Sequence, residues 1–569
     1  MPSVTTLLKR WQELKAEYLQ YADLQQEIAE RVIPHRSNIT RLLSPGERQT
    51  RELFDSTAVE ASENLAASLH GTLTPSTQPW LSLKLRQEEF NELPDVKNWL
   101  EDCSRRIHAA LRQSNWTTAV HEMYLDLVGP AAMGCLFVEE KAPLATGHFG
   151  GFRFATQAPG SYFVAEDAEG RIDTVFREVS LTARAILGKW KAEKVGDKIR
   201  DTVATKPDQR FTVLQAVMPN DDADRDERKR GPRHMPWRST YLIVETRHKL
   251  EEGGFEEFPF LCPRWAKTSG EVYGRGPSHT ALPDIKTLNK VVEFTLQAAP
   301  LAMIPPTIEL DDSVVGELDL RPGGRNVVSG PGNRNLSELF AFMQTGMKVD
   351  LSELSIERLQ GNIRRKYFSQ LLELKDKPNM TIPEITIRHD EMLRMLGPTA
   401  GRLESEFLNP GVERYFGIMA RAGALLPLPR TLAEQGQELP DLDIEYEGPL
   451  ARAQRTVELT AQDRVFGFVA ALTQAMAASG VPPAQAAAIW DVLKVDKWVR
   501  DRAEITGVRT DSLNSPEDVE TARQIRAQAQ QAEAERMQAM QTAEAAGKAA
   551  PMVKEIGAMA MAGQNGGSR

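Results

Sequence analysis

The sequence predicts a mainly helical α+β fold, because helical and strand-like patterns occupy separate parts of the chain. Strand-like pieces gather between Gly134 and Trp265, while helical periodicity precedes and follows them. The chain has 569 residues, 41% of them hydrophobic and 26% charged. This composition is ordinary for a folded protein, and the length predicts three or four structural regions.

An amphipathic helix is expected in residues 1–45. Its apolar positions recur at steps of four and three: Leu7, Trp11, Leu14, Tyr18, Tyr21, Ile28 and Val32. Gln25 is the polar interruption of this seam, and Pro34 ends the helix. A seam of period 3.5 is typical of a helix packed against others. It fits a contact with its own domain's core and a contact with a neighbouring subunit about equally well.

An α+β region is expected to follow. Helices are predicted at about 51–70, 94–113 and 116–128. The strand candidates are CLFVEE, GFRFAT, SYFVAED, DTVFREV, FTVLQAVM, YLIVETR and FPFLCPRW, with a helix near 183–193 between the fourth and the fifth. Turn residues bound these pieces, as in antiparallel sheets. The polar stretch 221–233 is interpreted as a solvated hairpin loop.

Two helices bracketing an irregular insert are predicted from residue 277 onward. The first covers about 282–299 and is expected to stop at Pro300, Pro305 and Pro306. The second covers about 351–374, with Arg358 and Arg365 opposite its apolar stripe. That stripe comprises Ile356, Leu359, Ile363, Tyr367, Leu371 and Leu374. The turn-rich segment 301–350 is expected to be a small strand-and-loop excursion.

The last third is predicted to be helical with breaks. A polar loop, 375–381, precedes a long helix over 383–424 that Gly397–Pro398 and Pro410–Gly411 interrupt. A strand candidate, DLDIEYEG, comes next, and helices are expected at 450–478, 483–493 and 496–505. After Asn514 an exposed Ala-, Gln- and Glu-rich helix is expected to fray toward the end.

The sequence lacks the usual marks of an enzyme. It has no GxxxxGK[ST] phosphate loop, no GxSxG and no HExxH motif, and its nine histidines show no zinc-like spacing. Cys103, Cys135 and Cys262 share no metal-like spacing, so we expect buried free thiols. We therefore expect no catalytic residue, no metal and no cofactor.

Charge and hydropathy exclude two further classes. The net charge of −10 argues against a conventional nucleic-acid binder, which needs a basic surface, but not against a protein that handles DNA without gripping it. No run approaches the ~20 apolar residues of a membrane span, so no membrane partner is expected. The start, MPSVTTLLKRWQEL, lacks a secretory apolar core, which with the odd cysteine count favours synthesis in a reducing cytoplasm.

Two long segments carry a family resemblance. They are WAKTSGEVYGRGPSHTALPDIKTLNKVVEFTLQAAPLAMIPP, residues 265–306, and MTIPEITIRHDEMLRMLGPTAGRLESEFLNPGVERYFGIMARAGALLP, residues 380–427. Both resemble the head-to-tail connector (portal) family of short-tailed podophages, and LFDSTAVEASENLAASLHGTLTP near the N-terminus is similar too. The order YGRGP, LPDIKTLN and double proline is specific in combination. The resemblance covers about residues 5–500.

The resemblance implies a ring, expected to be a dodecamer, of subunits with wing, stem, clip and crown regions. It assigns the regions as follows: N-terminal helix 1–45, wing 46–275, first stem helix 276–300, clip 301–350, second stem helix 351–374, tunnel loop 375–382, kinked wing helix 383–430, crown 431–514 and tail 515–569. The ring is expected at the portal vertex of a virion, between capsid and tail, after synthesis in the host cytoplasm.

The same resemblance implies functions and partners. Double-stranded DNA is expected to pass through the ring during packaging and ejection and to be retained between them. The clip is expected to dock terminase and then a tail adaptor protein. Major capsid protein, scaffolding protein and internal core proteins are further expected partners. The resemblance also places the packaging ATPase in the separate terminase, in agreement with the missing phosphate loop here.

An acidic subunit suits a channel for DNA. Twelve copies would present a large negative charge to a duplex that carries one negative charge per ~1.7 Å, so the DNA would slide and not stick. Sparse cations could then act as brakes, and the candidates for DNA contact are Lys375 and Lys377, followed by Arg358 and Arg365. Solvation of the loop explains the lysines equally well, and ion pairs between subunits are the favoured explanation of the arginines. Gly397 and Pro398 are the candidate hinge, and a fixed bend imposed by packing explains them nearly as well.

Two other functions remain open. One is a non-portal helical virion scaffold or tail component without DNA contact, which a filament or a small dimer would reveal. The other is an enzyme of an unrecognised family, which ATP hydrolysis or nuclease activity in the purified protein would reveal.

Overall fold

The computed structural model describes most of the chain. The described residues are 3–41, 52–76, 78–91, 93–143, 149–221, 234–310, 319–328, 340–342, 349–369, 396–433, 442–446, 449–479, 494–506 and 518–540, with some single positions between them. The chain forms two compact units, Met1–Gln454 and Arg455–Arg569. The candidate site lies in the first unit, and the tunnel-loop range 375–382 lies outside the described residues.

Helix α1, Val4–Val32, confirms the predicted seam. Leu7, Leu14 and Tyr18 are buried against the chain's own strands, including β4, Tyr162–Glu166. Gln25 is buried as well, and its side-chain oxygen accepts a hydrogen bond of 2.6 Å from the hydroxyl of Tyr18, which removes the cost of burying the amide oxygen alone. The apolar face of α1 therefore belongs to its own subunit's core.

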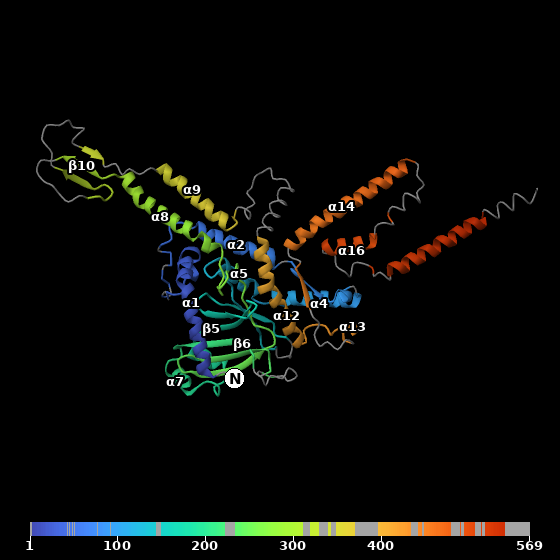
Figure 1. Cartoon of the computed structure of the whole chain (residues 1–569), viewed down its shortest axis with the longest axis horizontal. Helices are drawn as coiled ribbons and strands as arrows, with labels where there is room; N and C mark the ends of the chain where they lie inside the picture. The colour runs from blue at the N-terminus through green and yellow to red at the C-terminus, as the bar shows by residue number, and fades with distance from the viewer. Residues whose placement is uncertain are drawn as a thin grey trace, which may run out of the picture. The chain divides into compact units, whose positions relative to one another are not determined.

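The antiparallel sheets of the wing range appear largely as predicted. A five-stranded sheet has the order β4-β5-β6-β7-β8, and a three-stranded sheet has the order β3-β2-β9. Figure 1 labels β5 and β6 of the larger sheet. Their remaining bounds are β2 Leu136–Glu140, β3 Phe152–Thr156, β5 Ile172–Thr182, β6 Arg210–Pro219, β7 Trp237–Ile243, β8 His248–Phe255 and β9 Phe260–Leu261. Strand β8 was not predicted. Short helices α6, Ala183–Lys189, and α7, Asp197–Thr205, cover the end of β5 and β6.

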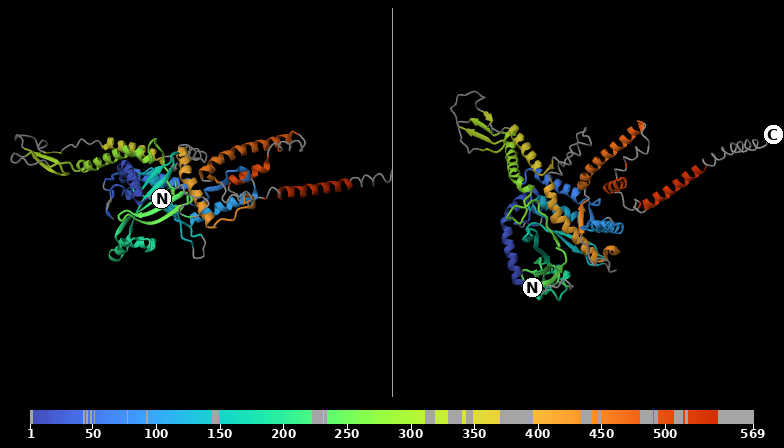
Figure 2. Two further views of the ribbon diagram at one scale, coloured as in Figure 1. Left: turned by 60° about the horizontal axis from the view of Figure 1, so that its bottom comes forward. Right: turned by 45° about the vertical axis from the view of Figure 1, so that its right-hand side comes forward.

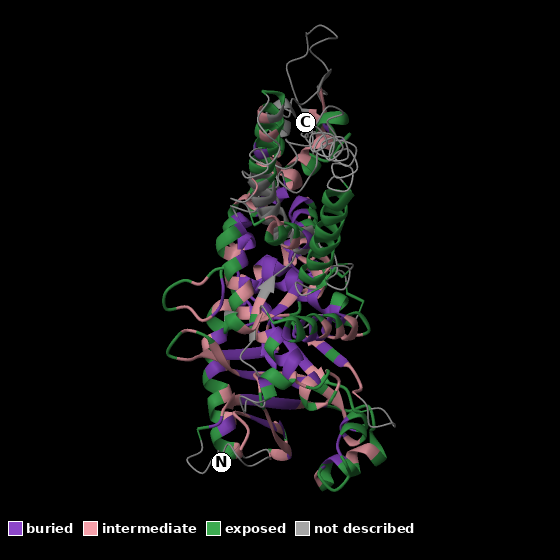
Figure 3. Cartoon of the chain, turned by 90° about the vertical axis from the view of Figure 1, so that its right-hand side faces the viewer, coloured by how far each residue is buried: buried purple, intermediate pink, exposed green. Residues whose placement is uncertain are grey.

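The main core lies where helices meet the three-stranded sheet. Its helices are α2 Thr57–Leu73, α4 Pro94–Arg112, α5 Trp116–Val128 and, further along the chain, α12 Asn409–Arg421. Trp116 stacks between Trp80 and Phe407, with ring centroids 6.0 and 5.9 Å away and ring planes within 7°. Figure 3 shows that buried residues gather on the inner sides of the helices and strands, while exposed residues lie on the outer sides of the helices.

Strands far apart in the sequence close one side of this core. Strand β1, Leu81–Leu85, pairs antiparallel with β13, Leu442–Tyr446. The pattern DLDIEYEG predicted the second strand, but the alternating LSLKL of the first was missed. The pairing brings the end of the first unit back onto its N-terminal third.

The two bracketing helices are present with different ends. Helix α8 spans Pro277–Met303, so the predicted stop at Pro300 was wrong. Pro300 lies in the last turn, where its missing N–H costs a single bond, and its carbonyl accepts the N–H of Ile304 at 2.9 Å. Between the helices, β10 Thr307–Leu310, β11 Arg325–Val328 and β12 Phe340–Phe342 form a small mixed sheet, in agreement with the predicted excursion.

Helix α9 spans Val349–Lys366, which is shorter at its end than the predicted 351–374. The chain leaves the helix because Phe368 has a φ of 59°, in the left-handed region. Its 18 residues reach about 27 Å, instead of the ~36 Å expected for 24 residues. Leu371 and Leu374 of the predicted stripe lie outside the described residues.

The long helix after residue 396 is continuous through Pro410. Residues 396–403 are α-helical, Glu404–Leu408 form a π-helix, and α12 follows directly. The N–H of Asn409 donates to the carbonyl of Glu404, five residues back. The expected interruption at Pro410–Gly411 therefore takes the form of a widened turn, which accommodates a proline that cannot donate a backbone hydrogen bond.

The second unit is helical where it is described. It contains most of α14, Pro449–Ala478, then α16, Val495–Thr506, and a helix over 518–540, all near the predicted ranges. Arg502 pairs with Asp463, and Arg523 pairs with Asp496 at 2.6 Å. No helix in the described residues is long and apolar enough to cross a membrane.

Candidate functional site

Helices α8 and α9 pack side by side and carry the small β10–β12 sheet at their far end (Figures 1 and 2). Their foot, the start of α8 with the end of α9, is fixed in the main core. Ser278 donates a hydrogen bond of 2.6 Å to the carbonyl of Val128 and accepts one of 2.7 Å from the buried hydroxyl of Tyr367. Lys366 pairs with Asp284 at 2.7 Å.

The middle of the pair is tied to the N-terminal part of the chain. The side-chain oxygen of Asn289, which is buried, accepts the backbone N–H groups of Phe54 and Asp55 at 2.8 and 3.2 Å. Gln360 on α9 donates to the carboxylate of Asp55 at 2.8 Å. The segment before α2 thus contacts both helices and fixes their relative position.

The tip of the pair, the last three turns of α8 and the residue after it, has a different surface. Phe294, Leu296 and Met303 are 56%, 57% and 83% exposed, and Ile304 is exposed as well. Within the described residues these large apolar side chains have no core to enter. Exposed apolar groups that cluster on one element mark an interaction surface.

The predicted DNA-contact residues separate into two groups. Arg358 and Arg365 lie seven residues apart on α9, so they share a face, and both are exposed. Neither arginine forms an ion pair with any residue that the structure describes. Lys375 and Lys377 lie outside the described residues. The predicted hinge residues Gly397 and Pro398 are helical and exposed in segment 396–403, next to a π-helix that the sequence did not predict.

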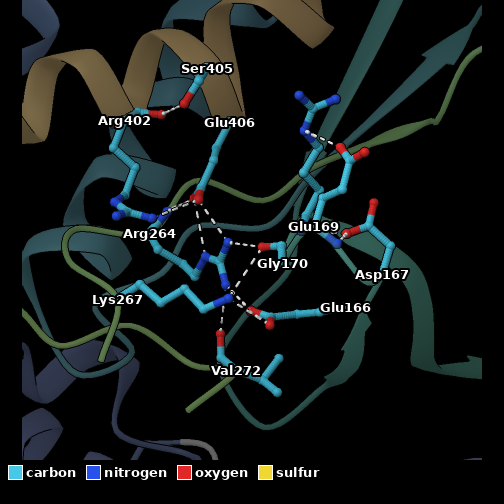
Figure 4. Close-up of polar contacts among 11 residues, drawn as sticks. Glu166, Asp167, Glu169, Gly170, Arg264, Lys267, Val272, Arg402, Ser405 and Glu406 are labelled. Carbon is cyan, nitrogen blue, oxygen red and sulfur yellow. Dashed lines mark hydrogen bonds and ion pairs between the residues drawn. The ribbon is translucent and has the colours of Figure 1, made fainter. Parts of the chain in front are cut away.

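A buried ionic cluster sits beneath the foot of α8 (Figure 4). Arg264, which is almost fully buried, bonds Glu406 of the π-helix through its backbone N–H at 2.9 Å and through its guanidinium at 2.7 and 3.2 Å. The same guanidinium pairs with Glu166 of β4 and donates to the carbonyl of Gly170 at 2.8 Å. Lys267 pairs with the other oxygen of Glu166 at 2.7 Å.

The cluster joins three parts of the first unit. Glu166 comes from the five-stranded sheet, Glu406 from the long helix, and Arg264 and Lys267 from the segment that leads into α8. Burial acts to lower the pKa of Arg264, but the hydrogen bonds and charges of Glu406 and Glu166 raise it above its usual value. The guanidinium is therefore a permanent cation held by two carboxylates. The cluster therefore ties the segment before α8 to the five-stranded sheet and to the long helix.

A second buried arginine fixes α12 to the sheets. Arg414 donates to the carbonyl of Val138 at 3.0 and 3.3 Å and to the carbonyl of Glu257 at 3.0 Å. Burial lowers its pKa to about 10, with the Glu257 carboxylate acting in the opposite direction. Arg421 pairs with the same carboxylate at 2.7 Å. Backbone carbonyls that a strand edge leaves free are satisfied here by a helix side chain.

Sequence reasoning missed these anchoring residues. Glu406 and Arg414 stand in mixed-charge helical settings that look like solvated surface. For Arg264, the sequence did offer one sign of burial: it lies between apolar residues in CPRW, at the end of a predicted strand. A buried arginine at such a position needs an acidic partner. Among the described residues, no group of three or more His, Cys, Asp or Glu side chains could hold a metal ion.

Comparisons with known proteins agree with this architecture. The family model described as "Bacteriophage head to tail connecting protein" matches residues 4–513. A "Probable portal protein" of Bordetella phage BPP-1 is 29% identical over 540 residues, covering 92% of this chain and 91% of the relative. A "Portal protein" of Salmonella phage epsilon15 is 27% identical over 560 residues, covering 96% and 95%.

Chains from solved gene transfer agent particles also match. One comes from the virion of the native particle, with a TM-score of 0.36 at 10% identity. The other comes from the neck of the native particle computed with C12 symmetry, with a TM-score of 0.33 at 11% identity. Each match covers 80% of this chain and 99% of the other. With the family model spanning nearly the whole chain, this protein belongs to the bacteriophage head to tail connecting proteins.

Proposed function

We propose that copies of this chain form a ring in which the α8–α9 pairs are the wall of a DNA channel. The chain is a portal subunit of the virion, at the junction of capsid and tail. The observation that best supports the ring is that the tip of α8 exposes apolar side chains while its foot is fixed in the core. An isolated helix tip of this kind is poorly solvated, whereas neighbouring copies in a ring would bury it.

The remaining regions take their roles in this proposal. The segment 301–350 with the β10–β12 sheet is the clip that docks terminase and then the tail adaptor, and residues 46–275 with the kinked helix 383–430 are the wing. Residues 431–514 are the crown, and residues 515–569 are the tail. A dodecamer, contacts with capsid, scaffolding and internal core proteins, and DNA contact by Lys375, Lys377, Arg358 and Arg365 belong to the same proposal.

The proposed role is structural and not catalytic. The family is one of virion structural proteins, and DNA transport through the ring needs a smooth acidic passage more than a reactive site. The motor activity is assigned to a separate terminase. Detectable ATP hydrolysis by the purified chain, abolished by a point substitution, would contradict this assignment.

Electron microscopy of the purified full-length protein tests the ring. We expect closed rings with an axial opening wide enough for a DNA duplex. Leu296→Asp at the tip of α8 should leave the subunit folded but prevent closed rings, because it places a charge in the proposed contact between copies. Leu19→Asp on the exposed side of α1, where Leu19 has the same 57% exposure, is the matched control and should leave the rings intact.

The outcomes separate the candidate functions. Filaments or small dimers from the unaltered protein would favour a virion scaffold or a tail component. Rings that survive Leu296→Asp would show that the tip of α8 is not the contact between copies.

A further inference from the structure

Two cysteines face each other in the core of the first unit. Cys135 precedes β2 and Cys262 follows β9, and the antiparallel register pairs Leu136 with Leu261 and Phe137 with Phe260. One step further along this register, Cys135 stands opposite Cys262. Their Sγ atoms are 3.8 Å apart, and the residues are 0% and 5% exposed.

The position of the pair in the ladder suits a covalent bond. The N–H of Gly134 donates to the carbonyl of Pro263 at 2.8 Å, and the N–H of Val138 donates to that of Pro259 at 2.9 Å. The pairs 134 with 263 and 138 with 259 are therefore hydrogen-bonded, and since the two kinds of pair alternate, Cys135 and Cys262 form a non-hydrogen-bonded pair next to the first of them. Cα atoms of such pairs are about 4.5 Å apart, within the ~4.4–6.8 Å range that a disulfide spans.

We propose that Cys135 and Cys262 are a disulfide site that is reduced when the chain is made and oxidised in the released virion. The two S–H bonds break and one S–S bond forms. Two protons and two electrons pass to an oxidant outside the cell, either dissolved oxygen or a small-molecule disulfide. The Sγ atoms close from 3.8 Å to about 2.0 Å, a change that rotation of the two side chains can supply.

Burial makes this oxidation slow. The pKa of Cys135 is raised well above its usual value, first by burial and then by the neighbouring Cys262, and the thiolate is the reactive form. Assembly in a reducing cytoplasm is therefore complete before the bond forms, while a virion outside the cell has time to oxidise. Cys103 lies buried in α4 with no second cysteine beside it, and it serves as an internal control.

The bond would lock the region below α8. It closes the chain from residue 136 to residue 261, which contains both wing sheets, and its second cysteine stands two residues before Arg264 of the ionic cluster. A long closed loop restricts the unfolded chain most. Oxidation would thus stabilise the sheets against opening after the subunit has reached its final place.

The test uses the unaltered full-length protein. One sample is kept in a thiol reductant and the other is treated with diamide, whose N=N bond accepts the two electrons and two protons. Both samples are unfolded with an alkylating reagent present, digested without reduction and mapped by mass spectrometry. We expect a linked peptide carrying Cys135 and Cys262 in the treated sample alone, free alkylated Cys103 in both, and a melting temperature higher by several degrees after treatment.

The same map on virions stored in air tests the biological setting, and the linked peptide should be present there as well. Cys262→Ala should abolish both the linked peptide and the rise in melting temperature, whereas Cys103→Ala should preserve both. Three alkylated thiols in the diamide-treated protein, or in stored virions, would overturn the proposal, as would bonds between subunits that involve Cys103.

Discussion

The foot and the tip of α8 differ in the burial of their apolar side chains, although they belong to one helix. At the foot, Ile285 and Leu288 are buried, and Ser278 and Asn289 hydrogen-bond distant parts of the chain. At the tip, Phe294, Leu296 and Met303 are exposed. The foot is complete within one subunit, while the tip has apolar area without a partner in the described chain. Subunit stability and assembly are therefore expected to depend on different halves of the same helix.

The largest effect is expected below the foot. Arg264→Met removes the cation between Glu166 and Glu406 and leaves two carboxylates with too few partners in a buried site. We expect a loss of about 3–5 kcal/mol in the free energy of unfolding, measured by urea denaturation of the subunit. Arg402→Met, which removes a partly exposed pair with Glu406, is the control and should cost less than about 1 kcal/mol. Equal losses would mean that Arg264 is not the anchor.

Truncations along α8 compare its two halves directly. Leu288→Ala at the foot should lower the free energy of unfolding by about 2–5 kcal/mol, because it leaves a cavity. Leu296→Ala at the tip should change it by less than about 0.5 kcal/mol but reduce the fraction of subunits found in rings by native mass spectrometry. If both variants destabilised the isolated subunit alike, the division between foot and tip would be wrong.

Acid is expected to weaken the foot before the tip. His279 lies in the first turn of α8, where its Nδ1 accepts the N–H of Gly276 at 3.4 Å. Burial and then the charge of Arg275 lower its pKa from 6.5 to about 4, against the opposing carboxylate of Glu271. Since the unfolded chain binds this proton first, stability is full above pH 6.5 and is lost as the pH falls toward 4. The loss is about 1–3 kcal/mol.

Urea denaturation at several pH values measures this slope. His279→Gln retains a neutral acceptor and should reduce the slope between pH 6.5 and 4; a part remains, because burial lowers the pKa of His108 to about 4 as well. His35→Gln, at an exposed position in the middle of η1, Pro34–Arg36, is the control and should keep the slope of the unaltered protein. An unchanged slope in His279→Gln would remove His279 as its source.

The smallest effect on stability is expected on the exposed face of α9. Replacing Arg358 and Arg365 together by Gln should change the free energy of unfolding by less than about 0.5 kcal/mol. DNA retention in filled particles should fall if these side chains contact DNA, and ring stability should fall if they pair between subunits. Counting filled and empty particles alongside ring dissociation in urea distinguishes the two, and no change in either would leave the arginines as solvated surface.

Local patterns predicted most elements but not their ends. The seam of α1, the bounds of α5 and most wing strands follow from periodicity, because their apolar residues face a nearby core. Helix α9 ends where Phe368 adopts a left-handed backbone, directly after Tyr367, which bonds Ser278, 89 positions away in the chain. Pro300 is tolerated because it lies in a last turn. Helix ends that depend on such tertiary contacts cannot be predicted from a short stretch of sequence.

The candidate site was predictable in outline only. The sequence predicts two helices on either side of an irregular insert, with exposed arginines on the second helix. The structure agrees, with α8, α9 and the small sheet between them in the chain. The anchors Arg264, Glu406 and Arg414 were missed because a charged residue looks the same in a sequence whether it is solvated or buried with a partner. The ion-pair partner cannot be recognised from the sequence either, because Arg264 and Glu406 are 142 positions apart in the chain.

The pairing of β1 with β13 has a consequence for synthesis. Strand β1 emerges from the ribosome long before Leu442, its first partner residue, and at about 5–20 residues per second the interval is roughly 20–70 s. During that time one edge of Leu81–Leu85 has no strand beside it and can pair with another nascent chain. Early folding of α4 against β1 covers one face but not this edge. Production of the protein is therefore expected to depend on chaperones that hold the nascent chain, and to improve at low temperature.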